Sequence, residues 1–309
     1  MIRYLSHSEI DPAKWNRAVH NSVLPTVFAE FDMLDLLTGP DTWDALVMQH
    51  YEAVMPIPYR KKGMLKYVYT PFFLPQMGIF SAHELPAKEI DRFLEEVSRR
   101  YILADILLNE MMERQKIYND YFVSYLLELK RPYNELYRQF HENTRRNIKA
   151  GEKKQCQVTV GEEQVKEIIR LFRNNRGHSE SVHYREEDYK ILEQVSNTLS
   201  KRNLLEIYGV RTPNGELAAG ALFVKDGNRR WFWFSGRDNA LSDCKPVFTL
   251  IDHYIRDHAG TDLSLDFNGS KNENVARLYR GFGGVIYSIP FVRRYKNLFW
   301  KMALRLTGK

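Results

Sequence analysis

The sequence contains few cysteines and no long apolar run. Cys156 and Cys244 are its only two cysteines, far apart and without a CxxC or Cys/His ligand spacing, so it predicts neither a disulfide framework nor a structural zinc site. The longest apolar stretch, 101–108, is interrupted by Asp105, and the N-terminal residues lack a signal-peptide core. We therefore expect a cytoplasmic protein without a membrane span or a bound metal.

The composition is that of a packed globular chain. Hydrophobic residues make up 44% of the 309 residues and aromatic residues 13%, which is more than a disordered chain keeps in water. The charge is uneven: residues 1–128 carry 13 basic and 18 acidic side chains, and residues 129–309 carry 32 basic and 21 acidic ones. This asymmetry predicts polyanionic partners such as RNA, nucleotide-linked substrates or anionic lipid headgroups, although a solvated basic surface explains it equally well.

The same order of strands and helices is expected in both halves of the chain. A basic helical stretch, 131–155, separates an N-terminal lobe, 1–130, from a C-terminal lobe, 156–309, which we expect to carry the active site. Within the second lobe the periodicity predicts a strand at 156–160, followed by helices near 162–176, 185–202, 245–258 and 271–280 with strands between them.

Residues 262–284, DLSLDFNGSKNENVARLYRGFGG, combine a buried strand, a polar turn and a helix. Ser270 and Glu273 have the spacing of a capping box, so Ser270 is predicted to cap the helix. The turn formed by Asn268, Gly269 and Ser270 would then direct amide hydrogens toward a phosphate or a developing oxyanion.

Four segments carry a resemblance to known proteins. The pattern N-x-x-V-x-x-x-Y followed by FG, at 272–283, resembles the last helix of the GNAT fold. LDFNGS with YRGFGG is similar to the Fem family of aminoacyl-tRNA-dependent peptidyltransferases, as are NTRRNIKAGEKK at 143–154 and TPFFLPQMGIF at 70–80. The resemblance implies an α+β fold of two tandem GNAT-like (acyl-CoA N-acyltransferase) domains, each with a mixed, mostly antiparallel sheet flanked by helices.

Two departures from these families affect the expected donor. GNAT acetyltransferases hold the coenzyme A pyrophosphate with a Gly-rich turn before a helix, whereas SGRDNALSDCKPVF at 235–248 has no such run. The helices between 161 and 202 are too short for the coiled-coil arm of some Fem enzymes. The donor is therefore either an aminoacyl-tRNA or an acyl-CoA, and no tightly bound cofactor is expected.

The resemblance implies an acyltransferase that moves an aminoacyl or acyl group onto an amine acceptor, such as a cell-envelope precursor. An acetyl-CoA-dependent N-acetyltransferase is one alternative. A noncatalytic module that binds RNA or a nucleotide-linked ligand on the same fold is another.

Asp266 and Tyr279 are the predicted catalytic residues. Asp266 would orient or deprotonate the amine, or else it bonds to nearby turn amides. Tyr279, which matches the tyrosine that the GNAT family often uses as a general acid, would protonate the leaving group, or else it is a half-buried core residue. The residues expected to bind substrate are Arg145, Arg146, Arg176, Arg237, Lys245, Asn268, Gly269 and Ser270.

The C-terminal segment 293–309 has six basic and no acidic residues. Leu298, Met302 and Leu306 recur every four positions, which predicts a basic amphipathic helix. Such a helix either docks on the second lobe or makes peripheral contact with the inner face of an anionic membrane, and no stable protein partner is expected.

Overall fold

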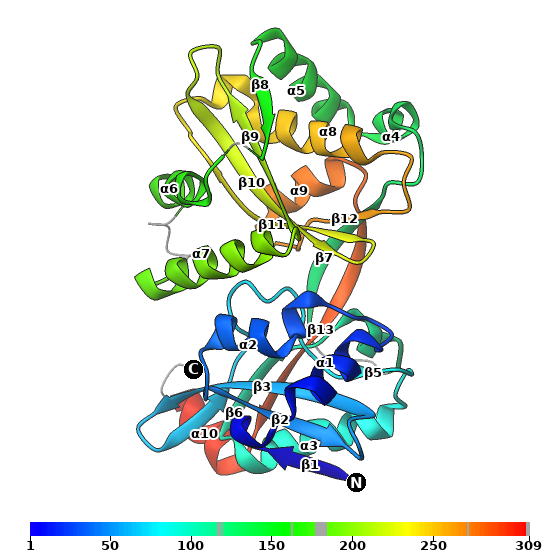
Figure 1. Ribbon diagram of the computed structural model, residues 1–309, viewed down its shortest axis with the longest axis vertical. Helices are drawn as coiled ribbons and strands as arrows, with labels where there is room; N and C mark the ends of the chain where they lie inside the picture. Colours follow the sequence, from blue (N-terminus) through cyan, green and yellow to red (C-terminus); the bar gives the residue numbers. More distant parts are fainter. Residues whose placement is uncertain (116–117, 119, 162, 177–183, 271, 307–309) are drawn as a thin grey trace. The chain divides into compact units, whose positions relative to one another are not determined.

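A computed structural model of the chain describes residues 1–309 except 116–117, 119, 162, 177–183, 271 and 307–309 (Figure 1). The chain forms two compact units: unit 1 contains Met1–Phe122 and Ser288–Lys309, and unit 2 contains Val123–Tyr287. In the described part of the chain, no helix is long and apolar enough to cross a membrane.

Unit 1 is a mostly antiparallel sheet with helices packed on it. Its strand order is β1-β2-β3-β4-β6-β13, β5 also pairs with β3, and β4 runs parallel to β6. A buried aromatic group at the β1–β2 end includes Trp15 and Trp43, whose rings meet edge to face at 5.1 Å. The strands are β1 (Ile2–Leu5), β2 (Trp43–Met48), β3 (Ala53–Lys62), β4 (Leu65–Val68), β5 (Phe80–Ser81), β6 (Leu103–Leu107) and β13 (Val285–Tyr295), and the α-helices are α1 (Pro12–His20), α2 (Phe31–Thr38), α3 (Ala87–Arg100) and α10 (Leu298–Leu306).

Unit 2 has the same kind of sheet, in the order β7-β12-β11-β10-β9-β8, with β11 and β12 parallel and the other pairs antiparallel. Its strands are β7 (Asp120–Glu128), β8 (Gln157–Val160), β9 (Leu205–Arg211), β10 (Leu217–Asp226), β11 (Arg229–Arg237) and β12 (Ser264–Asp266), and its α-helices are α4 (Tyr133–Gln139), α5 (Glu142–Lys153), α6 (Val165–Asn175), α7 (Glu186–Lys201), α8 (Pro246–His258) and α9 (Glu273–Gly281). The expected α+β class with mostly antiparallel sheets is confirmed.

Alternation along β10 places helices on both faces of the unit 2 sheet. Phe223 stacks on Tyr254 of α8, with ring centroids 3.6 Å apart. Gly220 faces the opposite side, where a Cβ atom would lie 2.6 Å from Ile168 of α6. Because successive residues of a strand point to opposite faces, the small residue admits α6 while the aromatic residue fills the core under α8.

The division into units differs from the predicted lobes, 1–130 and 156–309 with 131–155 between them. The boundaries fall inside β7 and β13, and both α4 and α5 belong to unit 2. The second half of β13 pairs with β6, with Phe291 opposite Leu107, so the C-terminal residues return to unit 1. Hydrophobic periodicity locates a strand but does not say which sheet it joins, because that depends on pairing with distant segments.

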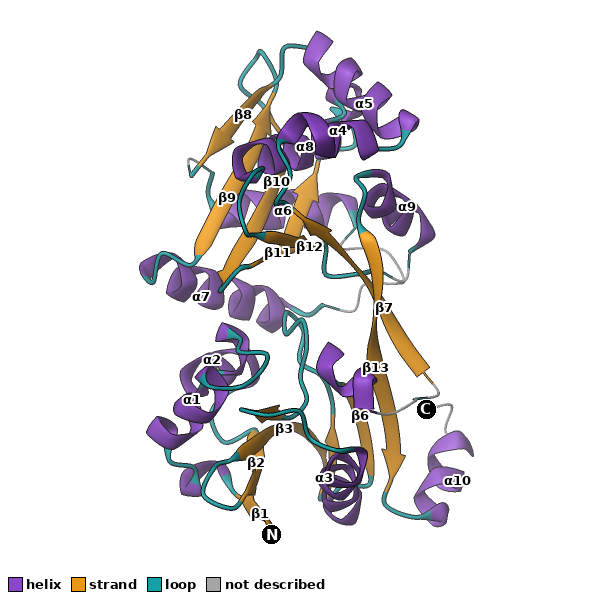
Figure 2. Ribbon diagram, turned by 90° about the vertical axis from the view of Figure 1, so that its right-hand side faces the viewer, coloured by secondary structure: helices purple, strands orange, loops and turns teal. Residues whose placement is uncertain are grey.

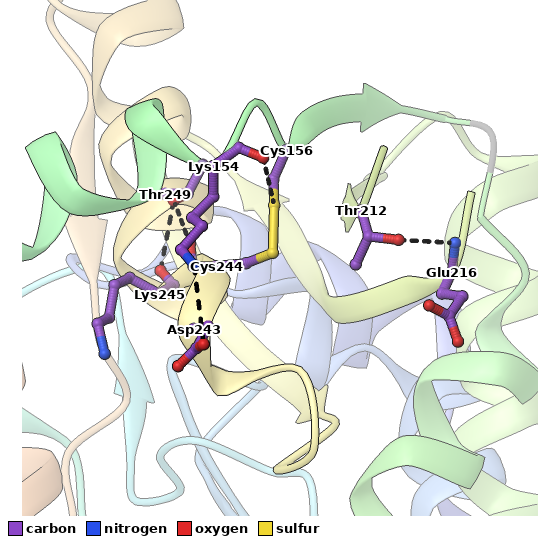
Figure 3. Close-up of a disulfide and its surroundings, with 8 residues drawn as sticks. All are labelled: Lys154, Cys156, Thr212, Glu216, Asp243, Cys244, Lys245 and Thr249. Atoms are coloured by element: carbon purple, nitrogen blue, oxygen red, sulfur yellow. Dashed lines mark hydrogen bonds and ion pairs between the residues drawn. A yellow bond between two sulfur atoms is a disulfide. The ribbon is translucent and has the colours of Figure 1, made fainter. Parts of the chain in front are cut away.

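The prediction that the cysteines form no disulfide is wrong. Cys156, just before β8, is bonded to Cys244, just before α8, with Cα atoms 6.4 Å apart (Figure 3). A Cβ atom on Gly151 of α5 would lie 2.8 Å from the carbonyl oxygen of Cys244, so this glycine lets α5 approach the start of α8. Close packing of these helices brings together two cysteines that are 88 residues apart, a proximity that sequence spacing does not reveal.

Candidate active site

The strands β11 and β12 part at the centre of unit 2. Their ladder has three pairs, from Arg229–Ser264 to Trp231–Asp266, after which β11 continues to Arg237 while β12 ends at Asp266. The chain leaving β12 therefore turns away from β11 here. The strands therefore part at their carboxyl ends, which is where ligands bind in many sheets with parallel strands.

Asp266 is completely buried at this point, and residues from several elements contact its carboxylate. One carboxylate oxygen accepts hydrogen bonds from Ser124 Oγ (2.9 Å) and from the backbone N–H of Asn268 (2.9 Å). The other accepts one from Tyr287 Oη (2.6 Å) and lies 3.4 Å from Arg229 Nη1. Each carboxylate oxygen therefore has two close partners.

This environment favours a positioning role for Asp266. Burial raises the pKa of its carboxyl group, and the charge of Arg229 with the three hydrogen-bond donors opposes the rise. A carboxylate so enclosed does not meet an amine from solvent, but its bond to Asn268 fixes the start of the following turn. Of the predicted alternatives, bonding to a turn amide is present in the structure, while orientation or deprotonation of the amine stays a prediction.

Tyr279 of α9 lies beside this turn. Its ring stacks on Phe267, with centroids 4.6 Å apart and planes 19° apart, and meets the edge of Phe232 from β11. Among the described residues, none forms a hydrogen bond with its hydroxyl group. Burial raises the pKa of the phenol, and the positive charge of Arg176 partly opposes this effect. The phenol is therefore protonated at neutral pH, as a general acid must be.

The turn after β12 has an uncommon backbone. Asn268 (φ 55°) and Gly269 (φ 58°) are both left-handed, a conformation that asparagine and glycine tolerate best. The backbone N–H groups of Gly269 and Ser270 donate no hydrogen bond within the described part of the chain. They are thus free to donate to a bound anion or to an oxyanion.

The predicted capping box at Ser270 is wrong. The N-cap of α9 is Asn272, whose side chain accepts from the backbone N–H groups of Asn274 and Val275. Ser270 Oγ accepts from the backbone N–H of Asn272, at 3.0 Å, and so supports the turn and not the helix. Asparagine is as good an N-cap as serine, and Asn272 stands directly before the first helical residue.

Arg176 and Arg237 are brought near each other by Asn175, the last residue of α6. The Asn175 side chain donates to the carbonyl oxygen of Arg237 at 3.4 Å and accepts from Asn239 at 2.7 Å. Arg176 follows directly, and its charge acts on Tyr279. The two arginines thus lie on the side of unit 2 where α6 meets the end of β11.

The remaining predicted substrate residues lie elsewhere in unit 2. Arg145 and Arg146 are on α5, and Arg146 donates to Asn143 Oδ1 at 2.8 Å. Lys245 is left-handed (φ 48°) and precedes α8, beside Gly151 of α5. None of the described contacts connects these three residues to Asp266 or Tyr279.

Sequence reasoning missed Ser124, Tyr287 and Arg229, the side chains that hold Asp266. Ser124 offered the clearest signal, because it is a polar residue inside the apolar run of β7 and is completely buried. A polar side chain in a buried strand requires a partner. The partner lies 142 residues away, so the sequence alone could not identify it.

Comparisons with known proteins agree with this geometry. Residues 138–274 match a family model described as an acetyltransferase (GNAT) domain. FemX has a similar structure over 99% of this chain and 100% of its own, with a TM-score of 0.65 and 12% identity.

Two further solved structures have the same fold. The L-PGS from Bacillus licheniformis is similar over 97% of this chain and 98% of its own, with a TM-score of 0.54 and 12% identity. The C-terminal domain of a putative lysylphosphatidylglycerol synthetase from Agrobacterium fabrum is similar over 94% of both chains, with a TM-score of 0.52 and 10% identity. Among curated proteins, none matches the sequence.

These findings define the fold. Residues 138–274 match a GNAT domain, and the whole chain shares the two-unit fold of FemX, in agreement with the resemblance read from the motifs. The residues matched by the family model include the parting of β11 and β12, the turn at Asn268–Ser270 and the first residues of α9.

Proposed function

We propose that this protein transfers an aminoacyl or acyl group onto an amine acceptor at the Asp266–Tyr279 site of unit 2. The observation that carries the proposal is the Tyr279 side chain, which is 7% exposed, stacks on Phe267 and forms no hydrogen bond through its hydroxyl group with the described residues. The phenol lies beside a turn in which the amides of Gly269 and Ser270 donate no hydrogen bond within the described part of the chain, a position that suits a proton donor in acyl transfer.

In the proposed reaction each of these groups has one step. A neutral amine attacks the acyl carbonyl carbon, and the oxyanion that forms accepts hydrogen bonds from the backbone amides of Gly269 and Ser270. When the carbon–oxygen or carbon–sulfur bond to the carrier breaks, Tyr279 gives its proton to the leaving atom. The attacking nitrogen loses its own proton to water, which restores the charge balance once Tyr279 is reprotonated. Asp266 holds Asn268, and thereby the turn, in place.

Several features support an aminoacyl donor carried by a polyanion such as tRNA. The excess of basic residues is in 129–309, and Arg176 and Arg237 lie together at the end of α6. One similar structure is named a putative lysylphosphatidylglycerol synthetase, a name that contains an aminoacyl group. The acceptor class we propose is a cell-envelope precursor that carries an amine, and no tightly bound cofactor takes part.

A second candidate, an acetyl-CoA-dependent N-acetyltransferase, is favoured by the description of the matching family model. Two observations weigh against it. The segment 235–248 lacks the Gly-rich turn, and the first turn of α8 packs against α5, with Gly151 close to Thr249 and Cys244. A pyrophosphate at that helix N-terminus would have to compete with α5 for the same space.

Parallel titrations of the purified protein with acyl-CoA, aminoacyl-tRNA and uncharged tRNA, each at two salt concentrations, test the donor. Preference for aminoacyl-tRNA over uncharged tRNA, with affinity that falls as salt rises, supports the proposal. Tight acyl-CoA binding without that preference would move the protein to the N-acetyltransferases. Binding of RNA without any turnover of an aminoacyl donor would leave a noncatalytic binding module.

A further inference from the structure

The β3–β4 hairpin of unit 1 ends in an exposed apolar tip between lysines. Met64 is 100% exposed and Leu65 37% exposed, and the flanking Lys61 and Lys62 are also exposed. The segment 60–68, RKKGMLKYV, contains no acidic residue. A large apolar side chain held fully in water at the tip of a turn contributes nothing to the core, so its place in the fold calls for another explanation.

The C-terminal segment presents a second exposed apolar surface. The residues 293–295 complete β13, and the helix α10 begins at Leu298 (Figure 2). Leu298 is 69% exposed, Phe299 68% and Met302 58%. This helix belongs to unit 1 in the division of the chain. The side chain of Leu306 lies outside the described ones.

These two segments lie at the same end of the unit 1 sheet. The backbone N–H of Ile102 donates to the carbonyl oxygen of Lys66 at 3.2 Å, and the carbonyl oxygen of Ile102 accepts from the backbone N–H of Lys296 at 3.2 Å. One residue thus links the strand that leaves the hairpin tip to the strand that enters α10. The hairpin tip and the first turn of α10 therefore form one end surface, which consists of Met64, Leu65, Leu298, Phe299 and Met302 with Lys61, Lys62 and Lys296.

We propose that this end surface docks unit 1 on an anionic lipid bilayer. Apolar side chains from a hairpin tip and a helix would enter the boundary between headgroups and acyl chains, while the lysines beside them contact anionic headgroups. Neither 60–68 nor 296–309 contains an acidic residue that would oppose this contact. Nearby Arg99 and Arg100 both pair with Glu96, so they add little to the surface charge.

The chemistry of this surface fits a bilayer better than a second protein copy. A self-complementary interface would bring the same lysines of two chains together, and like charges repel at short range. The inference does not depend on the proposed acyl transfer, because all the residues belong to unit 1 while the candidate active site belongs to unit 2. It extends the expected peripheral contact of 293–309 to a surface made by two segments.

The test is co-sedimentation of the full chain with vesicles of phosphatidylcholine alone and of phosphatidylcholine mixed with phosphatidylglycerol. We expect binding to the mixed vesicles only, weakened by salt because exposed charges are screened. The double variant Lys61→Glu/Lys62→Glu should lower the partition coefficient roughly tenfold or more. Met64→Asp and Phe299→Asp should each lower it by a similar factor, since a charge then replaces an inserted apolar group.

Matched controls come from the opposite end of unit 1. Val23, 42% exposed, lies next to Ser81 beside the first residues of β3, and Lys88 is an exposed residue in the first turn of α3. Val23→Asp and Lys88→Glu should bind the mixed vesicles like the wild type. Thermal unfolding of every variant checks that the fold is kept.

Three results would overturn the inference. In the first, the wild type sediments with neither kind of vesicle. In the second, it binds both kinds equally and the hairpin and helix variants bind as well as the controls. In the third, size-exclusion chromatography shows a dimer that Met64→Asp or Phe299→Asp dissociates while vesicle binding is absent, which assigns the surface to a second copy of the chain.

Discussion

Each unit contains a buried aspartate that accepts a hydrogen bond from a tyrosine hydroxyl group, and one of these two aspartates stands where two parallel strands part. In unit 1, Asp44 on β2 accepts from Tyr101 Oη at 3.0 Å and from Tyr4 Oη, and Lys66 lies 3.6 Å away. In unit 2, Asp266 has a tyrosine, a serine and an arginine around it. The local chemistry of the two carboxylates is thus similar.

Their positions in the sheets differ. Asp44 lies inside β2, which pairs with β3 from Trp43 to Met48 and with β1 from Ala45 to Met48. Asp266 is the last residue of β12 and leads into the left-handed turn beside Tyr279. A buried carboxylate with its partners is therefore a structural device in both units. What unit 2 adds is a strand that ends early, a turn in which two amides donate no hydrogen bond and a phenol that forms none, as far as the described residues go.

Replacement of Tyr279 by phenylalanine should have the largest effect on activity. Loss of the proton donor should lower kcat by about 10²- to 10⁴-fold, while the free energy of unfolding should change by only about 1 kcal/mol, because the hydroxyl has no described partner to lose. Steady-state kinetics with the donor found by titration and urea unfolding measure the two quantities.

The matched variant in unit 1 is Tyr101→Phe. It removes a hydroxyl that donates to Asp44, so the free energy of unfolding should fall by about 1–2 kcal/mol with kcat unchanged. Equal kcat values for wild type and Tyr279→Phe would exclude Tyr279 as the general acid.

Removal of the disulfide should destabilise unit 2 alone, since both cysteines belong to it. In the chain-entropy account, a cross-link that closes a long loop contributes about 2–4 kcal/mol. Calorimetry with and without a thiol reductant should therefore show the unfolding of unit 2 at lower temperature, with unit 1 unmoved. The variant Cys156→Ser/Cys244→Ser should match the reduced protein and respond no further to reductant; a shift of both transitions would show that the units unfold together.

Local signals explain which parts of this structure the sequence could predict. Sustained apolar periodicity in the second half predicts helices whose ends lie within a few residues of those of α6, α7, α8 and α9. The resemblance of LDFNGS and of the segment at 272–283 located the turn and Tyr279 on adjacent elements. These features depend on residues close together in the chain.

Long-range pairing explains what the sequence missed. Asp266 was identified, but its partners Ser124 and Arg229 come from strands whose order in the sheet cannot be read from periodicity. The disulfide and the return of β13 to unit 1 depend equally on tertiary contacts. Arg145, Arg146 and Lys245 were grouped with the site by charge alone, and charge does not indicate distance.

The variants Asp266→Asn and Asp44→Asn test whether the two carboxylates differ in their effect on activity. Each loses charge-assisted hydrogen bonds, so the free energy of unfolding should fall by about 2 kcal/mol in both, as urea unfolding can measure. Only Asp266→Asn should also lower kcat, because only Asp266 fixes the turn that offers the amides of Gly269 and Ser270. If Asp266→Asn stays folded and retains the wild-type kcat, the carboxylate has no positioning role in the reaction.

The pH dependence of stability should show the smallest of these effects. Burial raises the pKa of Asp266 above its usual value of 3.8, so the folded state binds this proton more tightly than the unfolded state does. The stability that protonation contributes is complete below pH 3.8 and is lost as the pH rises through the pKa of the folded state. The asparagine of Asp266→Asn cannot titrate. The unfolding free energy of the wild type minus that of the variant should therefore fall from acid to neutral pH. A difference that rises over that range would mean that Arg229 and the three hydrogen-bond donors outweigh burial and hold the carboxylate in its charged form.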